Sequence, residues 1–331
     1  MEPVAVACAG SGRQIRVVAS RSRPYQQRKR GLEQETRALR LSAWMSLVMA
    51  ALGIGFGLAT ESDAIMLDGF FSLIGFVMAL VTIRVARLVV QPADEHFHFG
   101  YAQFEPFLNA IKGLLMLGVA GFALAGAVDT LIHGGRDINP GLATVYAAVA
   151  LTGCLAVGAA QRRAAATLGS PLLAVDSRNW LIDGLLSGVV LLVFAAAMIL
   201  GRTRWAVVVP YMDPALVILL VLGILFVPLR IVRDNMREIL AFAPASAVQE
   251  DVRRRVGEAL EDVPVESSQV RMMKVGRFLY VLNQIVVSPE FRPGRVGELD
   301  RVRERIAEAL DGVEPAPVVD TLFTEDARWA E

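Results

Sequence analysis

Residues 176–200 read DSRNWLIDGLLSGVVLLVFAAAMIL, and this stretch decides which kind of fold the chain adopts. The apolar part is long enough to cross a bilayer core, which requires roughly 20 apolar residues in a helix. Its beginning, however, carries Asp176, Arg178 and Asp183. A charge at membrane depth is costly, so such groups usually face a protein interior and mark an ion or proton path. The stretch therefore predicts a transmembrane helix with functional side chains.

The composition of the whole chain supports a membrane protein. Of its 331 residues, 54% are hydrophobic, which is more apolar surface than one soluble core of this length would bury. Basic and acidic residues balance at 33 each, so no basic excess suggests nucleic acid. Cys8 and Cys154 lie far apart, which argues against a disulfide framework. No short apolar segment with a cleavage site precedes the first long hydrophobic run, so we expect no cleaved signal peptide.

Six windows are long and apolar enough to span a bilayer. They are residues 41–60, 64–90, 107–132, 141–161, 171–200 and 212–232. One set of window ends is rich in arginine, namely Arg84, Arg87, Arg162, Arg163, Arg230 and Arg233. Because basic residues favour the cytoplasmic side, this set of ends and both termini are predicted to be cytoplasmic, in a plasma (inner) membrane protein. Residues 41–235 are the predicted membrane domain, and residues 1–40 a basic, flexible arm.

Residues 244–331 have the pattern of a soluble domain. Val252, Val256 and Leu260 form one apolar stripe, which predicts an amphipathic helix. Two strand-like runs meet at residues 275–277, a hairpin signal. A second helix and a closing strand follow, so the order is αββαβ, as expected for a small ferredoxin-like α+β domain. The soluble part contains no nucleophile and base pair and no phosphate-binding glycine loop, so we do not expect an enzyme.

Polar residues inside the windows form two stripes. Asp68 and Ser72 are four residues apart, as are Asn179 and Asp183, so each pair shares a helix face. Together they would offer an oxygen-only cluster that suits Mn²⁺, Fe²⁺ or Mg²⁺ better than Zn²⁺ or Cu⁺. Asp68 and Asp183 lie deep in their windows, which favours a function. Asp176 shares the second stripe but stands near the helix start, so for this residue we favour an interfacial role over metal binding.

An ordered set of motifs resembles the cation diffusion facilitator (cation efflux) family of divalent metal transporters. The motifs are LDGFFSLIGF (67–76), QPADEHFHFGYAQFE (91–105), NWLIDG (179–184), Asp213-Pro214 and LFTEDARWA (322–330). The resemblance covers nearly everything after residue 40 and implies six spans, a cytoplasmic dimerisation domain and a mid-membrane metal site. It is the ordered set that is specific, because no single motif is decisive.

The resemblance implies a metal site made of Asp68, Ser72, Asn179 and Asp183. The family pattern on the second helix is Asp-x-x-x-Asp, and here Ser72 replaces the second acid. On the fifth helix the family places His or Asp before the final Asp, and here Asn179 takes that position, as in manganese-handling members. The absence of the histidine fits a preference for a metal other than zinc.

The loop after the second window departs from the family pattern as well. Zinc-transporting relatives place Asp, His and His here, and this chain aligns Asp94, Phe97 and Tyr101 with them. His96 and His98 remain, and with Asp94 they form either a weaker cytoplasmic metal site or a set of interface residues that order the loop.

The sequence thus predicts a homodimeric exporter of divalent cations that exchanges metal for protons and prefers Mn²⁺ or Fe²⁺, with Zn²⁺ or Co²⁺ as further possible substrates. No cofactor is expected, because the metal is the transported substrate. Two alternatives stay open: a transport-impaired metal-sensing or scaffold membrane protein of the same fold, and a zinc exporter with a divergent site.

Overall fold

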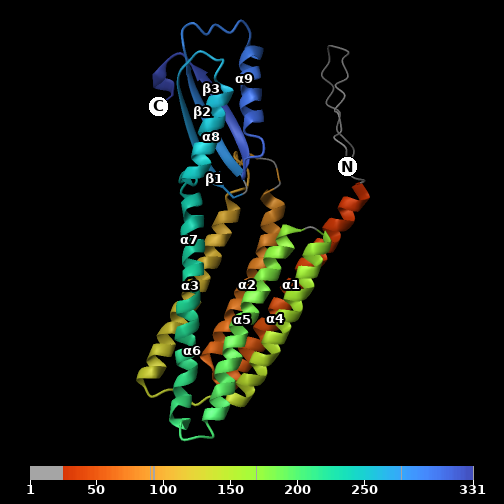
Figure 1. Cartoon of the computed structure of the whole chain (residues 1–331), viewed down its shortest axis with the longest axis vertical. Helices are drawn as coiled ribbons and strands as arrows, with labels where there is room; N and C mark the ends of the chain where they lie inside the picture. Colours follow the sequence, from red (N-terminus) through yellow and green to blue (C-terminus); the bar gives the residue numbers. More distant parts are fainter. Residues whose placement is uncertain (1–24, 90, 92–93, 169, 277, 331) are drawn as a thin grey trace.

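The computed structural model describes residues 25–89, 91, 94–168, 170–276 and 278–330. The chain forms a long helical bundle with a small α+β domain at one end (Figure 1). In chain order the bundle contains α1 (Tyr25–Thr60), α2 (Asp63–Val89), α3 (Phe104–Ile132), α4 (Pro140–Leu168), α5 (Pro171–Leu200), α6 (Val209–Ile224) and α7 (Phe226–Ile239). Six helical segments of the described chain are long and apolar enough to cross a membrane, which confirms the predicted membrane fold.

Two of the predicted helix boundaries were wrong. The first helix begins at Tyr25, so residues 25–40, predicted as part of a flexible arm, are helical, and residues 1–24 lie outside the described part. This segment consists mostly of good helix formers and contains no proline after Pro24, so nothing stops the helix. The sixth span is longer than predicted and is interrupted at Leu225. Pro228 explains this interruption, because proline cannot donate a hydrogen bond to the carbonyl four residues earlier.

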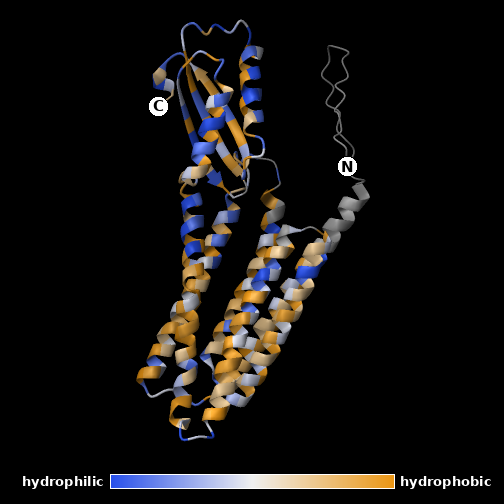
Figure 2. Cartoon of the chain, in the orientation of Figure 1, coloured by the Kyte–Doolittle hydropathy of each residue, from blue (hydrophilic) through white to orange (hydrophobic). Residues whose placement is uncertain are grey.

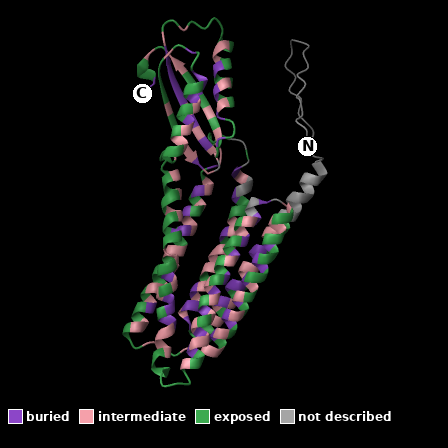
Figure 3. Cartoon of the chain, in the orientation of Figure 1, coloured by how far each residue is buried: buried purple, intermediate pink, exposed green. Residues whose placement is uncertain are grey.

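The bundle consists of two groups of helices. In one group α1 packs on α2 and α4, and α4 packs on α5; in the other, α3 packs along α6 and α7 (Figure 1). At the α1–α2 contact a Cβ atom on Gly53 would lie 2.5 Å from the Cα atom of Gly69. Only glycine permits so close an approach, a common device in membrane helix pairs. Hydrophobic residues predominate along the helices of the bundle, and buried residues occur along their length (Figures 2 and 3).

The C-terminal domain has the predicted αββαβ order. Its elements are α8 (Ser246–Ala259), β1 (Val265–Val275), β2 (Phe278–Val287), α9 (Val296–Ala309) and β3 (Ala316–Thr324). β1 pairs with β2 in antiparallel fashion, and β2 pairs with β3 in parallel. The parallel pair requires a crossover, which α9 provides. The predicted stripe of Val252, Val256 and Leu260 is buried in the core between helices and sheet, together with Ile306 and Leu310.

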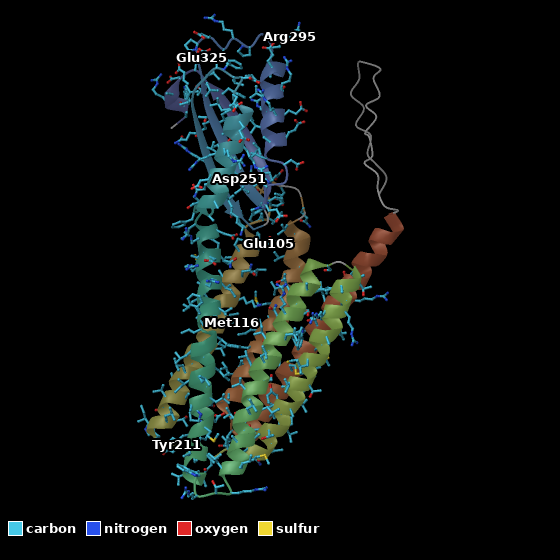
Figure 4. The ribbon with its side chains drawn as sticks, in the orientation of Figure 1. Glu105, Met116, Tyr211, Asp251, Arg295 and Glu325 are labelled. Carbon is cyan, nitrogen blue, oxygen red and sulfur yellow. The ribbon has the colours of Figure 1, made fainter. Side chains whose placement is uncertain are left out.

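Contacts at the end of the bundle attach this domain. The Nζ atom of Lys274 lies 2.6 Å from a carboxylate oxygen of Glu238, at the end of α7. The backbone N–H of Gly276, in the β1–β2 turn, donates to the other oxygen of Glu238. A Cβ atom on Gly276 would lie 2.8 Å from Oε2 of Glu105, which is labelled where α3 begins (Figure 4). The β-hairpin tip therefore rests directly on the ends of α3 and α7.

Candidate functional site

Asp68 of α2 is held by a tyrosine from another helix. The Tyr146 hydroxyl, on α4, donates a hydrogen bond of 2.5 Å to Oδ2 of Asp68. Tyr146 itself is buried, and its ring packs against Phe56 of α1 at a centroid distance of 5.7 Å. Because packing fixes the ring, the hydroxyl fixes the position of the carboxylate. Sequence reasoning missed Tyr146, since a lone tyrosine in an apolar helix has no motif around it.

Asp183 of α5 lies within range of other charges but is not enclosed. The carboxylate interacts electrostatically with Asp68 of α2 and with Lys112 of α3. The residue is nevertheless exposed in the described chain, and no described residue donates a hydrogen bond to its carboxylate. Charged groups of α2 and α3 therefore influence the Asp183 carboxylate, with Asp68 acting against its negative charge and Lys112 in favour of it.

The four predicted ligands lie in two levels. α2 runs toward the C-terminal domain and α5 runs away from it (Figure 1). Ser72 therefore lies one turn closer to that domain than Asp68, and Asn179 one turn closer than Asp183. Ser72 is half-buried and Asn179 is exposed. A cation that arrives from the side of the C-terminal domain would meet neutral oxygens first and carboxylates second.

The four predicted ligands do not form the enclosed type of site that holds a structural metal ion permanently. Among the residues that the structure describes, no group of three His, Cys, Asp or Glu side chains could hold a metal ion. Two carboxylates of opposite helices, one hydroxyl and one carboxamide can still supply oxygen ligands to a hard cation. Few charged ligands and partial exposure suit a cation that must bind and leave again, rather than one that stays.

Asp176 lies against α1 instead of completing this set. Its carboxylate interacts with Ser42 of α1 and with Trp180. The Trp180 indole N–H also donates to the Ser42 hydroxyl, at 2.7 Å. Oδ2 of Asp176 is buried without a hydrogen-bond partner among the described residues, and the interfacial role that the sequence analysis favoured stays a prediction.

A further buried acid, Asp213, closes the opposite end of the bundle. Its carboxylate accepts hydrogen bonds from the Ser62 hydroxyl (2.6 Å) and from the backbone N–H groups of Asp63 (3.0 Å) and Ala64 (3.4 Å). Asp213 thus caps the N-terminus of α2 with a side chain of α6, close to Tyr211 (Figure 4). Sequence analysis singled out the Asp213-Pro214 pair but predicted no partner for it.

The loop between α2 and α3 holds its polar groups with protein contacts. Oδ1 of Asp94 accepts the backbone N–H groups of His96 and Phe97, each at 2.9 Å, and Oδ2 accepts the Tyr101 hydroxyl. The ring of Phe97 packs on Tyr101 at 4.7 Å. His96 and His98 are both exposed. The residues aligned with the secondary zinc site therefore contact one another directly, and Asp94 already accepts three hydrogen bonds.

Six helices that are long and apolar enough to cross a membrane, with Asp68 and Asp183 inside two of them, define a membrane protein with acidic groups within its spans. The model of the cation efflux transmembrane domain matches residues 39–240, so the chain belongs to the cation efflux family. Proteins of this family are metal cation efflux transporters.

The chain is also similar to individual proteins, among them a magnetosome protein and two proteins named for cation efflux. The magnetosome protein MamM of Paramagnetospirillum magneticum is 24% identical over 254 residues, which cover 75% of this chain and 76% of that protein. The manganese efflux system protein MneP of Bacillus subtilis is 28% identical over 103 residues, 31% of this chain and 35% of MneP. The cation-efflux pump FieF of Shewanella oneidensis is 27% identical over 142 residues, 43% and 46% of the two chains.

Proposed function

We propose that this protein exports divalent metal cations from the cytoplasm in exchange for protons, with Asp68 and Asp183 as charged ligands and Ser72 and Asn179 as neutral ones. One observation carries the proposal. Carboxylates from two antiparallel helices lie within range of each other's charge, and the Asp183 carboxylate accepts no hydrogen bond from a described residue. Carboxylate oxygens without protein donors in a membrane interior need a cation or a proton.

The proposed preference is for Mn²⁺ or Fe²⁺ over Zn²⁺. The four ligands offer oxygen only, whereas zinc sites are usually built from imidazole and thiolate. Cys154 of α4 lies near Asp183, but it is buried against Gly184 of α5, where it serves packing. The names of MneP and FieF, a manganese efflux protein and a cation-efflux pump, support the same class of substrate. A zinc exporter with a divergent site is the alternative within this class.

Proton exchange follows from the ligand chemistry. A carboxylate binds either a metal ion or a proton, so metal binding and protonation compete at the same oxygens. A lower pH on the outer side would then favour metal release. In this proposal the protein lies in the plasma membrane, and the C-terminal domain lies in the cytoplasm with both termini.

A homodimer is part of the proposal. Val318 and Leu322 of β3 are 39% and 52% exposed, on a strand at the edge of the sheet. Apolar side chains at a sheet edge favour contact with another chain. The family resemblance assigns dimerisation to this domain, and the exposed strand supplies a surface for it.

A flux series tests the transporter proposal. Purified protein in proteoliposomes would be assayed with Mn²⁺, Fe²⁺, Co²⁺, Zn²⁺ and Mg²⁺, with and without a pH gradient. We expect the fastest uptake with Mn²⁺ or Fe²⁺ and a dependence on the gradient. Ser72→Asp restores the missing acid and should raise affinity for all five metals, with the largest gain for Zn²⁺. Absence of uptake for every metal would refute transport.

A second candidate is a metal-sensing or scaffold protein that has lost transport. Ser72 and Asn179 leave the site with two acids, and the described residues contain no group of three typical metal ligands. Calorimetry on the same preparation separates the two candidates. Metal binding without flux favours the sensor or scaffold, whereas binding together with flux favours the transporter.

A further inference from the structure

A pocket with two arginines lies between α4 and α5, and neither Asn179 nor Asp183 contributes to its lining. It has a volume of about 460 Å³, and Arg162 of α4 and Arg178 of α5 contribute the charged part of its lining. Small side chains, Ala165 and Ala174, leave room between the helices. The Ser177 hydroxyl donates to the Gly158 carbonyl at 3.2 Å, which ties the two helices together beside the pocket.

Neither arginine has an acidic partner in the described part of the chain. The structure shows no ion pair and no side-chain hydrogen bond to a described residue for Arg162 or Arg178, and the pocket lining contains no acid. The nearest acid along α5, Asp176, contacts Ser42 and Trp180 toward α1. Two guanidinium groups therefore share one pocket without a protein counter-charge.

The pocket lies near the end of the fourth and fifth spans, and this depth limits which ligands can reach it. Arg162 lies six residues before Leu168, where the fourth apolar span ends, and Arg178 lies five residues after Leu173, where the fifth begins. At 1.5 Å per residue, both lie about 8 Å inside the spans, at the end that carries the C-terminal domain. Long arginine side chains at this depth reach toward the headgroup layer, where a charge needs an anionic partner.

Below the arginines the surface is apolar. On α5, Ile182 and Leu185 follow Arg178 at helical spacings of four and seven and are 54% and 72% exposed. On α4, Leu155 lies seven residues from Arg162, on the same face, and is 44% exposed. A cationic pocket thus continues into an apolar surface toward the middle of the membrane.

We propose that this pocket binds the phosphate headgroup of an anionic phospholipid, with the acyl chains along the apolar surface of α4 and α5. The planar guanidinium groups can donate to phosphate oxygens in pairs, as arginine does at phosphate sites. Basic pockets between helices at this level are a recognised type of anionic lipid site. The apolar surface next to the pocket favours a lipid over free phosphate, because free phosphate has no acyl chain that could contact this surface.

The test measures lipid binding to the full-length protein in detergent by native mass spectrometry. Phosphatidylglycerol and phosphatidylcholine with the same acyl chains would be titrated in parallel. We expect the wild type to prefer phosphatidylglycerol, and Arg162→Gln with Arg178→Gln to weaken its binding roughly tenfold or more. Ala166→Trp, which fills the pocket but keeps both arginines, should also weaken binding, so the test does not depend on the double variant alone.

The matched control is Arg84→Gln with Arg163→Gln. These arginines are exposed near the same end of the spans, do not line the pocket, and their loss changes the net charge by the same amount. Phosphatidylglycerol binding should stay near the wild-type level in this control. An equal loss in the control would overturn the site in favour of general surface charge. Displacement of the lipid by millimolar inorganic phosphate or glycerol phosphate would overturn the assignment to a lipid.

Discussion

The bundle contains acids at two places, at the junction of the start of α2 with α6 and in the middle of the bundle, and their surroundings differ. At the end of the bundle away from the C-terminal domain, Asp213 is 1% exposed and accepts three hydrogen bonds. In the middle, Asp68 accepts one from Tyr146, and Asp183 is exposed with none from a described residue. The Asp213 carboxylate has its partners within the protein, whereas the carboxylates of Asp68 and Asp183 accept one hydrogen bond and none, respectively, from described residues.

This contrast distinguishes a structural acid from a functional one. Buried polar groups are normally satisfied, so an intramembrane acid that is fully hydrogen-bonded stabilises the fold. An acid with vacant lone pairs in the same membrane domain is costly unless a mobile ion or proton binds it. The number of donors therefore distinguishes Asp213 from Asp183, although both residues are aspartates.

The largest expected effect is on transport by Asp183→Ala. Loss of this carboxylate removes one of two charged ligands, so metal uptake into proteoliposomes should fall to background, a loss of at least about 100-fold. Since no described residue donates a hydrogen bond to it, its removal should leave the thermal unfolding midpoint almost unchanged. Unchanged flux would remove Asp183 from the site, and a strongly lowered midpoint would show that the acid is structural after all.

Asp213→Ala should show the reverse pattern. It removes the cap of α2 and leaves the Ser62 hydroxyl and two backbone N–H groups without their acceptor, which should lower the free energy of unfolding by about 2–4 kcal/mol. Denaturation in detergent measures this loss. In the conservative control Asp213→Asn, the amide oxygen can still accept, so about half of the loss should be recovered. A stable Asp213→Ala protein without flux would contradict the structural assignment.

Tyr146→Phe should have a smaller effect, on metal affinity. It deletes one hydroxyl, keeps the ring on Phe56, and frees Asp68 to rotate, so we expect affinity for Mn²⁺ to fall about tenfold with little change in maximal flux. Calorimetry and flux titrations measure both quantities. In a double-mutant cycle with Asp68→Ala, the tyrosine substitution should cost almost nothing further. Equal costs in the two backgrounds would show that Tyr146 does not act through Asp68.

The fold could be predicted from the sequence because its signals are local. Each span is a long apolar run, and the C-terminal order follows from stripes such as Val252, Val256 and Leu260. The early start of α1 at Tyr25 and the break at Leu225 were missed. Helix-forming but polar residues carry no hydropathy signal, and the apolar run continues through Pro228, so hydropathy does not show the break.

The candidate site could be predicted only in part. Spacing placed Asp68 with Ser72 and Asn179 with Asp183, but spacing cannot show which partner from another helix reaches each side chain. Tyr146 lies 78 positions from Asp68 along the chain, and Asp213 lies 151 from Ser62. Such contacts follow from helix packing, which has no pattern in a single sequence. Of the two arginines of the α4–α5 pocket, Arg162 was predicted only as a marker of the membrane end, and Arg178 was noted only as a charge at the start of the fifth span.

The smallest expected effect concerns Asp94, which accepts three hydrogen bonds, as Asp213 does, but is exposed. The Tyr101 hydroxyl, followed by the backbone N–H groups of Phe97 and His96, lowers the pKa of Asp94 below its ordinary value of 3.8. A lowered pKa in the folded state means that the carboxylate stabilises the loop above the ordinary pKa. This contribution is lost as the pH falls through the folded pKa.

Loop stability should therefore be constant between pH 7 and pH 5 and fall only in more acidic solution, below about pH 4. Hydrogen exchange at His96 and Phe97, corrected for the intrinsic rate at each pH, measures it. Asp94→Asn should raise exchange a few-fold at pH 7, because an amide is a weaker acceptor than a carboxylate, while flux and global unfolding stay near wild type. If Asp94→Asn destabilised the whole protein as much as Asp213→Ala, the number of donors and not burial would set the cost of losing an acid. A few-fold local effect would instead show that three hydrogen bonds stabilise this membrane protein strongly only where water cannot replace them.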